Sequence, residues 1–218
     1  MDKNQQAAFI VLEGVDGAGK GVQSRLLLKA MSGAGFDVIL TREPGGSPGA
    51  EEIRKLIVEG DADRWDDMTE LLLIYAARRS HIDETIKPSL AKGTWVISDR
   101  FADSSRAFQG VAGQLGLNVV ENIHGEVVGD FSPQITFILD LDPAISLERA
   151  EARGGGEDRF EQKGLDYQNK VRQGFQQLAA STPDTRKLID ASGRVEDVHR
   201  AIISEMNRHF GMALEIQQ

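Results

Sequence analysis

The sequence predicts an α/β domain in which a five-stranded parallel sheet is flanked by helices. Three observations predict it. Short apolar runs of strand length alternate with longer segments of helical periodicity. The runs are apolar at consecutive positions, as in parallel strands that are covered on both faces. The first run is followed directly by a glycine-rich turn and a helix, which is the order of a phosphate-binding loop.

Five apolar runs are predicted to be the strands. In chain order they cover residues 9–13 (FIVLE), 37–40 (DVIL), 94–98 (TWVIS), 135–139 (ITFIL) and, more weakly, 187–190 (KLID). Helices are predicted between them, over residues 20–34, 50–58, 68–87, 143–153, 161–180 and 195–210. The glycines at 154–156 do not favour a helix and predict a flexible loop.

The composition is that of an ordinary globular domain. Hydrophobic residues make up 40% and charged residues 27% of the 218 residues. We expect a frayed segment over residues 1–8 and one domain over residues 9–218. The net charge of −9 disfavours nucleic acid or an anionic membrane as partner, and no run approaches the roughly 18 apolar residues of a membrane span. The absence of cysteine excludes disulfides, and we expect a cytoplasmic protein.

The turn after the first predicted strand has the spacing of a phosphate-binding loop. It matches the first seven positions of the pattern G-x-x-x-x-G-K-[ST], between a strand and a helix. Backbone N–H groups at such a helix N-terminus form a concave anion site, and the lysine adds a charge near the β- and γ-phosphates. The alternative is a turn that only connects strand and helix. The residues are Gly14, Val15, Asp16, Gly17, Ala18, Gly19 and Lys20.

The eighth position departs from the pattern. The Ser or Thr expected there ligates Mg²⁺ through its hydroxyl, whereas this chain has Gly21 followed by Val22. Ser24 lies about one helical turn further on and is expected to point elsewhere. The phosphate cradle consists of main chain, so we expect it to persist. Asp99, after the third predicted strand, is the expected substitute that holds the metal through water.

Three further segments follow strands or lie in the longest predicted helix. They are TREPGGS at 41–47, LIYAARR at 73–79 and DRFADSSRAFQG at 99–110. Because ligands bind beyond the carboxyl ends of parallel strands, the segments that follow the first three strands should converge on one crevice. Together with EGVDGAGK, GTWVISDRF and LDLDP, these motifs resemble those of the bacterial thymidylate kinases, from about residue 9 to the C-terminal helix.

The resemblance implies a three-layer P-loop kinase fold with a small lid. It implies an enzyme that transfers the γ-phosphoryl group of ATP to dTMP with Mg²⁺ and is typically a homodimer. Binding of ATP is implied for the phosphate-binding loop together with Gly21, Val22, Arg149 and Arg153.

The resemblance assigns four positions to the acceptor's phosphate and sugar. Asp16 matches a carboxylate that accepts a hydrogen bond from the 3′-hydroxyl. Arg42 and Arg100 match arginines around the phosphate, which a guanidinium suits through two-pronged contacts. Asp99 matches a carboxylate that holds Mg²⁺ or orients this phosphate. The alternative role is turn formation for Asp16 and a surface ion pair for Arg42 or Arg100. For Asp99 it is a helix N-cap. The X–Pro bond before Pro44, also near dTMP in the family, is a candidate for the cis form.

The implied thymine site lies on the long helix and after the third strand. Arg78 matches an arginine that hydrogen-bonds the base, and Ser105 and Gln109 match polar positions near it. Phe108 matches an aromatic ring against the sugar, with core packing as an equal alternative. The stacking phenylalanine of the family is Ile74 here, which loses a ring contact worth roughly 0.5–1.5 kcal/mol.

The resemblance also implies a lid at about residues 149–160. One branch of the family has a catalytic arginine where this chain has Gly17, so the lid is expected to supply it through Arg153. A solvated helix face is the alternative. The expected catalytic residues are Lys20, Asp99, Arg100 and Arg153.

Two departures keep other functions open. Gly21 and Val22 are consistent with a nucleotide-binding protein that has little turnover. Ile74 is consistent with a kinase of another deoxynucleoside monophosphate, such as dUMP. Assays of ATP consumption with a panel of monophosphates distinguish these hypotheses.

Overall fold

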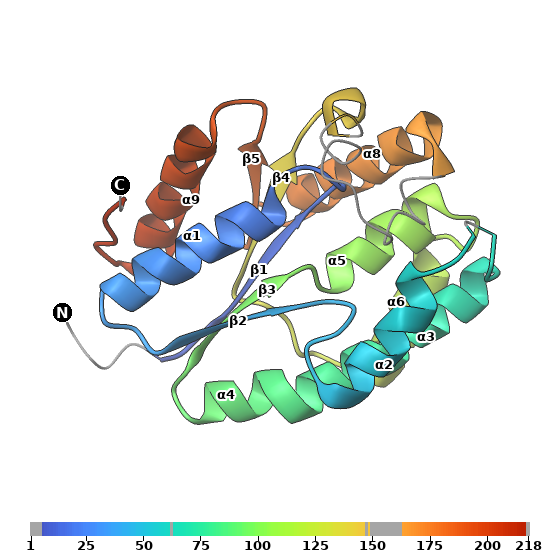
Figure 1. Cartoon of the computed structure of the whole chain (residues 1–218), viewed down its shortest axis with the longest axis horizontal. Helices are drawn as coiled ribbons and strands as arrows, with labels where there is room; N and C mark the ends of the chain where they lie inside the picture. The colour runs from blue at the N-terminus through green and yellow to red at the C-terminus, as the bar shows by residue number, and fades with distance from the viewer. Residues whose placement is uncertain (1–5, 62, 147, 149–162, 217–218) are drawn as a thin grey trace.

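The structure of the protein is a computed structural model, drawn whole in Figure 1. It describes residues 6–61, 63–146, 148 and 163–216. Within the segment expected to fray, Ala8 already packs in the core, with 3% of its surface exposed. The predicted lid, with Arg149 and Arg153, lies outside the described residues.

The centre of the fold is a parallel sheet with the strand order β2-β3-β1-β4-β5. Each strand begins and ends within two residues of its predicted range. The strands are β1 (Phe9–Gly14), β2 (Val38–Arg42), β3 (Trp95–Asp99), β4 (Ile135–Asp140) and β5 (Arg186–Asp190). In the register of the sheet, Leu12 of β1 is level with Asp99 of β3 and Phe137 of β4. The predicted α/β fold with a five-stranded parallel sheet is confirmed.

Both faces of β1 are covered, which explains why its sequence is apolar at consecutive positions. Ile10 and Leu12 belong to a core cluster that includes side chains of α1 (Lys20–Gly33) and α9 (Val195–Phe210). Phe9 and Val11 belong to a second cluster, which includes side chains of α3 (Asp67–His81) and α6 (Leu117–Val127). Figure 1 shows α1 and α9 side by side, and the two helices are in contact. The sheet is therefore the middle of three layers.

Most helices lie where periodicity predicts them. Helices α1 and α9 agree with their predicted ranges to within one residue. Helix α2 (Pro48–Val58) begins two residues early, because the Ser47 side chain accepts a hydrogen bond from the Ala50 N–H and proline suits the first helical turn. Helix α8 (Leu165–Ser181) covers most of the range predicted near the C-terminus. Of the predicted helix 143–153, residues 143–146 and 148 are helical and the rest lies outside the described residues.

Two helical regions differ from prediction. The helix predicted over 68–87 is α3, followed by the π-helical segment η1 (Ile82–Ile86) and α4 (Lys87–Ala91). After β3, where the sequence predicts no helix, the chain forms α5 (Ala102–Ser105), η2 (Arg106–Ala112) and α6. Glycines at 110, 113, 116 and 125 interrupt the helical pattern there. Packing of η2 against α6 and α8 stabilises this region through tertiary contacts that periodicity does not report.

Backbone hydrogen bonds hold the loops together at the carboxyl edge of the sheet. The Arg100 N–H donates to the Leu12 carbonyl and the Glu43 N–H donates to the Asp99 carbonyl, each at 2.9 Å. The loops after β1, β2 and β3 therefore lie side by side. The Glu43–Pro44 peptide bond is cis, as the sequence suggested. In the part of the chain that the structure describes, no helix has the length and apolar character needed to cross a membrane.

Candidate active site

The turn after β1 has the backbone of a phosphate-binding loop. Gly19, immediately before α1, has a φ of 94°, in the left-handed region that glycine adopts without strain. Gly17 has a φ of 81°, and a side chain there would overlap the carbonyl group of Ser146. The family's alternative arginine has no room at this position in the observed conformation. The loop directs the first N–H groups of α1 toward the carboxyl edge of the sheet.

Lys20 lies within this loop. Its Nζ donates to the carbonyl oxygens of Val15 at 2.8 Å and Gly14 at 3.1 Å, and lies 4.0 Å from an Asp16 carboxylate oxygen. Only 7% of the Lys20 surface is exposed. This burial, together with the charge of Arg100, lowers the pKa of Lys20 from 10.5 to about 8. A buried ammonium group beside the loop N–H groups is suited to binding phosphate oxygens.

Asp16 and Arg100 form an ion pair across the loop. Arg100 Nη2 lies 2.5 Å from Asp16 Oδ1, and Nη1 donates to the Gly14 carbonyl at 3.0 Å. The guanidinium also lies over the Phe108 ring, 5.1 Å from its centroid. Arg100 has a φ of 74°, the only non-glycine residue with positive φ among those that the structure describes. Such strain is typical of functional sites, where the surroundings over-determine a backbone conformation.

Glu13 is linked to Arg100 through the Ser104 hydroxyl. The sequence motifs did not identify Glu13 as a site residue. Its side chain is fully buried and accepts hydrogen bonds from the N–H groups of Phe101 (2.8 Å) and Ser104 (3.0 Å). The Ser104 hydroxyl donates to Glu13 at 2.6 Å and accepts from Arg100 Nη1 at 2.9 Å. A continuous chain of hydrogen bonds thus joins Glu13, Ser104 and Arg100. The available signal was a carboxylate at the end of an apolar strand, directly before the glycine-rich turn.

The Glu13 carboxyl is expected to make stability depend on pH. Burial raises its pKa from 4.5 to about 7, although the charge of Arg100 acts in the opposite direction. Between these values the folded chain binds a proton that the unfolded chain releases, so this group's contribution to stability falls as pH rises. The full difference is about 3 kcal/mol. We expect the free energy of unfolding, measured with urea, to fall less between pH 4.5 and pH 8 for Glu13→Gln than for wild type. Equal losses in the two proteins would contradict the role of Glu13.

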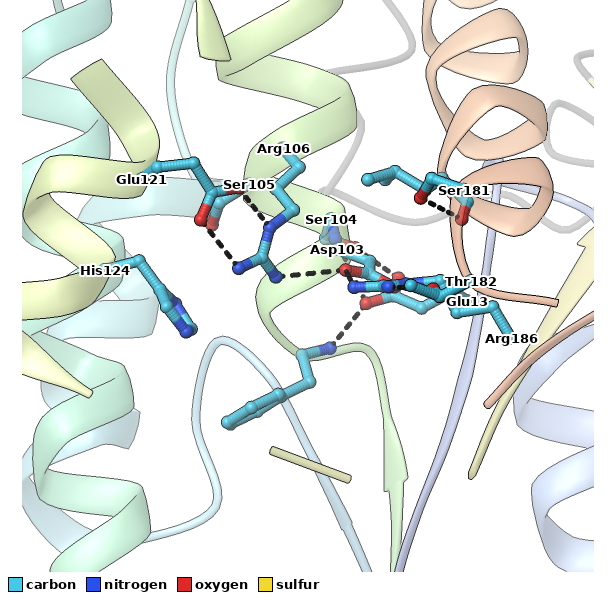
Figure 2. A network of polar contacts seen from close by, with 12 residues as sticks. Glu13, Asp103, Ser104, Ser105, Arg106, Glu121, His124, Ser181, Thr182 and Arg186 are labelled. Carbon is cyan, nitrogen blue, oxygen red and sulfur yellow. Dashed lines mark hydrogen bonds and ion pairs between the residues drawn. The ribbon is translucent and has the colours of Figure 1, made fainter. Parts of the chain in front are cut away.

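A second polar network fixes the segment that carries Arg100 against β5 and α6. Arg186 donates to both carboxylate oxygens of Asp103, at 2.6 and 2.9 Å, and Arg106 joins Asp103 to Glu121 (Figure 2). Burial alone would raise the pKa of Asp103, but the hydrogen bonds and charges of Arg186 and Arg106 bring it below its ordinary value. Figure 2 shows Glu13 and Ser104 directly beside this network. The backbone after β3 is therefore fixed by Glu13, through the N–H groups of Phe101 and Ser104, and by the ion pairs of Asp103.

Two of the three polar residues predicted near the base, Arg78 and Ser105, are in direct contact. Arg78 is buried and donates to Glu43 at 2.7 Å, to the Ser105 hydroxyl at 3.0 Å and to the Phe101 carbonyl at 3.1 Å. These bonds bring Arg78 and Ser105 together and hold both beside Phe101. The Gln109 amide donates to Glu70 at 2.7 Å. Within the described residues, the Gln109 carbonyl oxygen is buried without a hydrogen-bond partner, which leaves an acceptor for a ligand.

The apolar residues assigned to the nucleoside lie in the core. Ile74, 8% exposed, packs in a small cluster with Ile57 and Val58 between α3 and α2. Phe108, 5% exposed, lies against Phe175 with ring centroids 6.2 Å apart. Phe108 thus combines core packing, the alternative expected from sequence, with its contact to Arg100.

A cavity opens between the loop after β2 and the start of α1. Its volume is about 770 Å³, and its lining includes Arg25, Thr41, Arg42, Ser47 and Asp99. Arg42 is 53% exposed and pairs with Glu51 at 3.0 Å, which is the surface ion pair considered as its alternative. Pro44 follows Arg42 by two residues, and its carbonyl accepts a hydrogen bond from Arg54 at 2.7 Å.

The donors at this site fit Mg²⁺ held mainly by substrate. Asp99 Oδ2 lies 3.4 Å from the point that a Cβ at Gly21 would occupy, beside the position where the motif has its metal-binding hydroxyl. Among the described residues, no group of three or more His, Asp or Glu side chains is arranged to hold a metal ion. Mg²⁺ commonly uses one or two carboxylates with phosphates and water, so a single carboxylate beside the loop suits it.

Comparisons with known proteins agree with this geometry. The family model described as thymidylate kinase matches residues 12–202. The thymidylate kinase of Caulobacter vibrioides is 48% identical over 207 residues, which cover 95% of this chain and 99% of the relative. That of Jannaschia sp. is 50% identical over 194 residues, covering 89% and 93%. A crystal structure of thymidylate kinase from Ehrlichia chaffeensis superposes with a TM-score of 0.75 at 32% identity, covering 92% of this chain and 98% of that one. The resemblance seen in the sequence is confirmed.

Proposed function

Because this chain belongs to the thymidylate kinase family, we propose that it transfers the γ-phosphoryl group of ATP to dTMP, giving ADP and dTDP. The observation that carries the proposal is the meeting of the phosphate-binding loop, Lys20 and the Asp16–Arg100 pair at one edge of the sheet. An acceptor phosphate oxygen attacks the γ-phosphorus in line, and no covalent enzyme intermediate is needed.

The donor side of the reaction is served by the loop. Its N–H groups and Lys20 would bind the β- and γ-phosphates, with Lys20 turning its hydrogen bonds from the Gly14 and Val15 carbonyls to phosphate oxygens. Because these donors are held in place before the reaction, they stabilise the charge that develops on the transferred group without reorganisation. Asp99 would hold Mg²⁺, which neutralises phosphate charge when bound.

The acceptor is proposed to span the cavity and the Arg78 region. Arg42 and Arg100 would contact its phosphate and Asp16 its 3′-hydroxyl, while Arg78, Ser105 and Gln109 would contact the base. Ile74 and Phe108 would bury the base and the sugar. Support comes from the Gln109 carbonyl oxygen, which is buried without a hydrogen-bond partner among the described residues, and from the contact between Arg78 and Ser105.

The lid is proposed to supply Arg153 to the transferred phosphoryl group, with Arg149 against ATP. Arg153→Ala should lower kcat by on the order of 10²-fold while changing the affinity for dTMP little, because the arginine acts mainly in the transition state. Initial-rate kinetics with both substrates varied measure this difference. A large rise in the KM for dTMP with unchanged kcat would contradict the proposal.

The substrate is tested by Mg²⁺-dependent ADP release with dTMP, dUMP, dCMP, dGMP and dAMP as acceptors. The proposal expects the highest kcat/KM with dTMP. Binding of ATP and dTMP without turnover would instead identify the protein as a nucleotide-binding protein, as the missing hydroxyl at Gly21 allows. A preference for another monophosphate would show that Ile74 has changed base selection.

Two properties of the working enzyme are proposed from the family resemblance: it acts in the cytoplasm, and it acts as a homodimer. Light scattering of the purified chain tests the homodimer by its mass, against 23.8 kDa for one chain.

A further inference from the structure

Arg25 lies against the space that the missing side chain at residue 21 leaves open. A Cβ at Gly21 would have two near neighbours within 4 Å, Asp99 Oδ2 at 3.4 Å and Arg25 Nη1 at 3.5 Å. Arg25 follows Gly21 by four positions in α1, so both lie on one face of the helix. Long helical side chains point toward the N-terminus of their helix, which directs the Arg25 guanidinium back to the phosphate-binding loop.

The guanidinium of Arg25 is available to a ligand. In the described ranges of the chain, the structure gives Arg25 no hydrogen bond and no ion pair, and its side chain is exposed. Arg42, the other arginine that lines the cavity, is engaged by Glu51. Asp99 and Arg25 both line the cavity beside Gly21, next to the loop where the proposed transfer takes place.

The neighbours of Arg25 identify the ligand that it suits. Besides Asp99, the cavity is lined by Thr41 and Arg42 at the end of β2, by Ser47 and Glu51 after it, and by Gly21 in the first turn of α1. Glu51 is paired with Arg42, and Arg25 has no ion pair among the described residues. A guanidinium in this state beside hydroxyl groups favours a phosphate dianion, which accepts two parallel N–H donors.

From this juxtaposition we infer that Arg25 binds the phosphate of the nucleoside monophosphate acceptor, in the space that Gly21 leaves free. The inference rests on the proposed function. It adds Arg25 to the acceptor site, and it explains Gly21 by the space that the Arg25 guanidinium needs. A threonine at position 21 would add two atoms beyond Cβ and displace the guanidinium. Where the loop pattern has a hydroxyl ligand for the metal, this chain has open space beside an arginine.

The test is calorimetric titration of dTMP into wild type, Arg25→Ala and Lys29→Ala. Lys29 is an exposed cation one turn further along α1, outside the cavity lining, so its variant controls for net charge and folding. Arg25→Ala should bind dTMP about tenfold more weakly, as expected for one charge-assisted contact, while Lys29→Ala binds like wild type. Thymidine, which lacks the phosphate, should bind equally to all three proteins. Equal dTMP affinity of Arg25→Ala and wild type overturns the inference and leaves the kinase function intact.

A double-mutant cycle tests the link to Gly21. In a Gly21→Thr background, Arg25→Ala should change dTMP affinity by less than about twofold, because the arginine is already displaced. A full tenfold effect in that background would overturn the role of the glycine. If wild type binds no dTMP and turns over no acceptor, the proposed function fails as well, which the titration of wild type alone reveals.

Discussion

Lys20→Ala is expected to lower kcat by on the order of 10²–10³-fold while the fold persists, a loss typical for one preorganised donor to developing charge. The ammonium group lies within hydrogen-bond distance of the Gly14 and Val15 carbonyls, in the loop that would hold the transferred phosphoryl group. With little solvent around it, its interaction with phosphate charge is weakly screened.

The stability of this variant separates chemistry from folding. Burial destabilises the charged form of Lys20, as its lowered pKa of about 8 indicates, so removing the ammonium group costs the fold little. Coupled ADP-release assays give kcat, and urea unfolding gives stability, for Lys20→Ala and for Lys29→Ala on the same helix. Turnover of Lys20→Ala within threefold of wild type would show that the donor phosphates bind elsewhere.

The sheet was predictable because its physical signal is local. A strand buried on both faces must be apolar at consecutive positions, and Phe9–Gly14 shows that pattern without reference to the rest of the chain. The region after β3 lacks such a signal. Its short helices depend on packing of η2 against α8, which lies some 60 positions further along the sequence, so periodicity alone predicts no helix there.

The part of the candidate site that could be predicted consists of motif residues directly after the ends of strands. Asp16 and Arg100 follow β1 and β3, and the parallel order of these strands brings the two side chains together. Glu13 was missed because its role appears only when Phe101, 88 positions away, folds over it. Ile74 shows a different limit: the sequence identified a departure from the family, but packing against Ile57 could be seen only in the structure.

Arg100→Ala is expected to lower kcat/KM for dTMP by about 10²-fold or more, because the change removes a phosphate-binding guanidinium together with its hydrogen bonds to Asp16 and the Gly14 carbonyl. Arg100→Lys keeps the positive charge but loses the two-pronged guanidinium group. The single nitrogen of lysine cannot occupy the positions of both Nη1, which contacts Gly14 and Ser104, and Nη2, which contacts Asp16, so about a tenfold loss is expected.

Ser104→Ala is the matched comparison, because it breaks the hydrogen-bond chain to Glu13 and leaves the guanidinium in place. Its kcat/KM for dTMP should fall less than that of Arg100→Lys. The fall should appear as a higher KM for dTMP with little change in kcat, since a less firmly held arginine mainly weakens substrate binding. Steady-state kinetics of the three variants, with thermal unfolding as a control for folding, gives the order. If Ser104→Ala were as inactive as Arg100→Ala, the backbone turn at Arg100, and not its guanidinium, would be what the reaction requires.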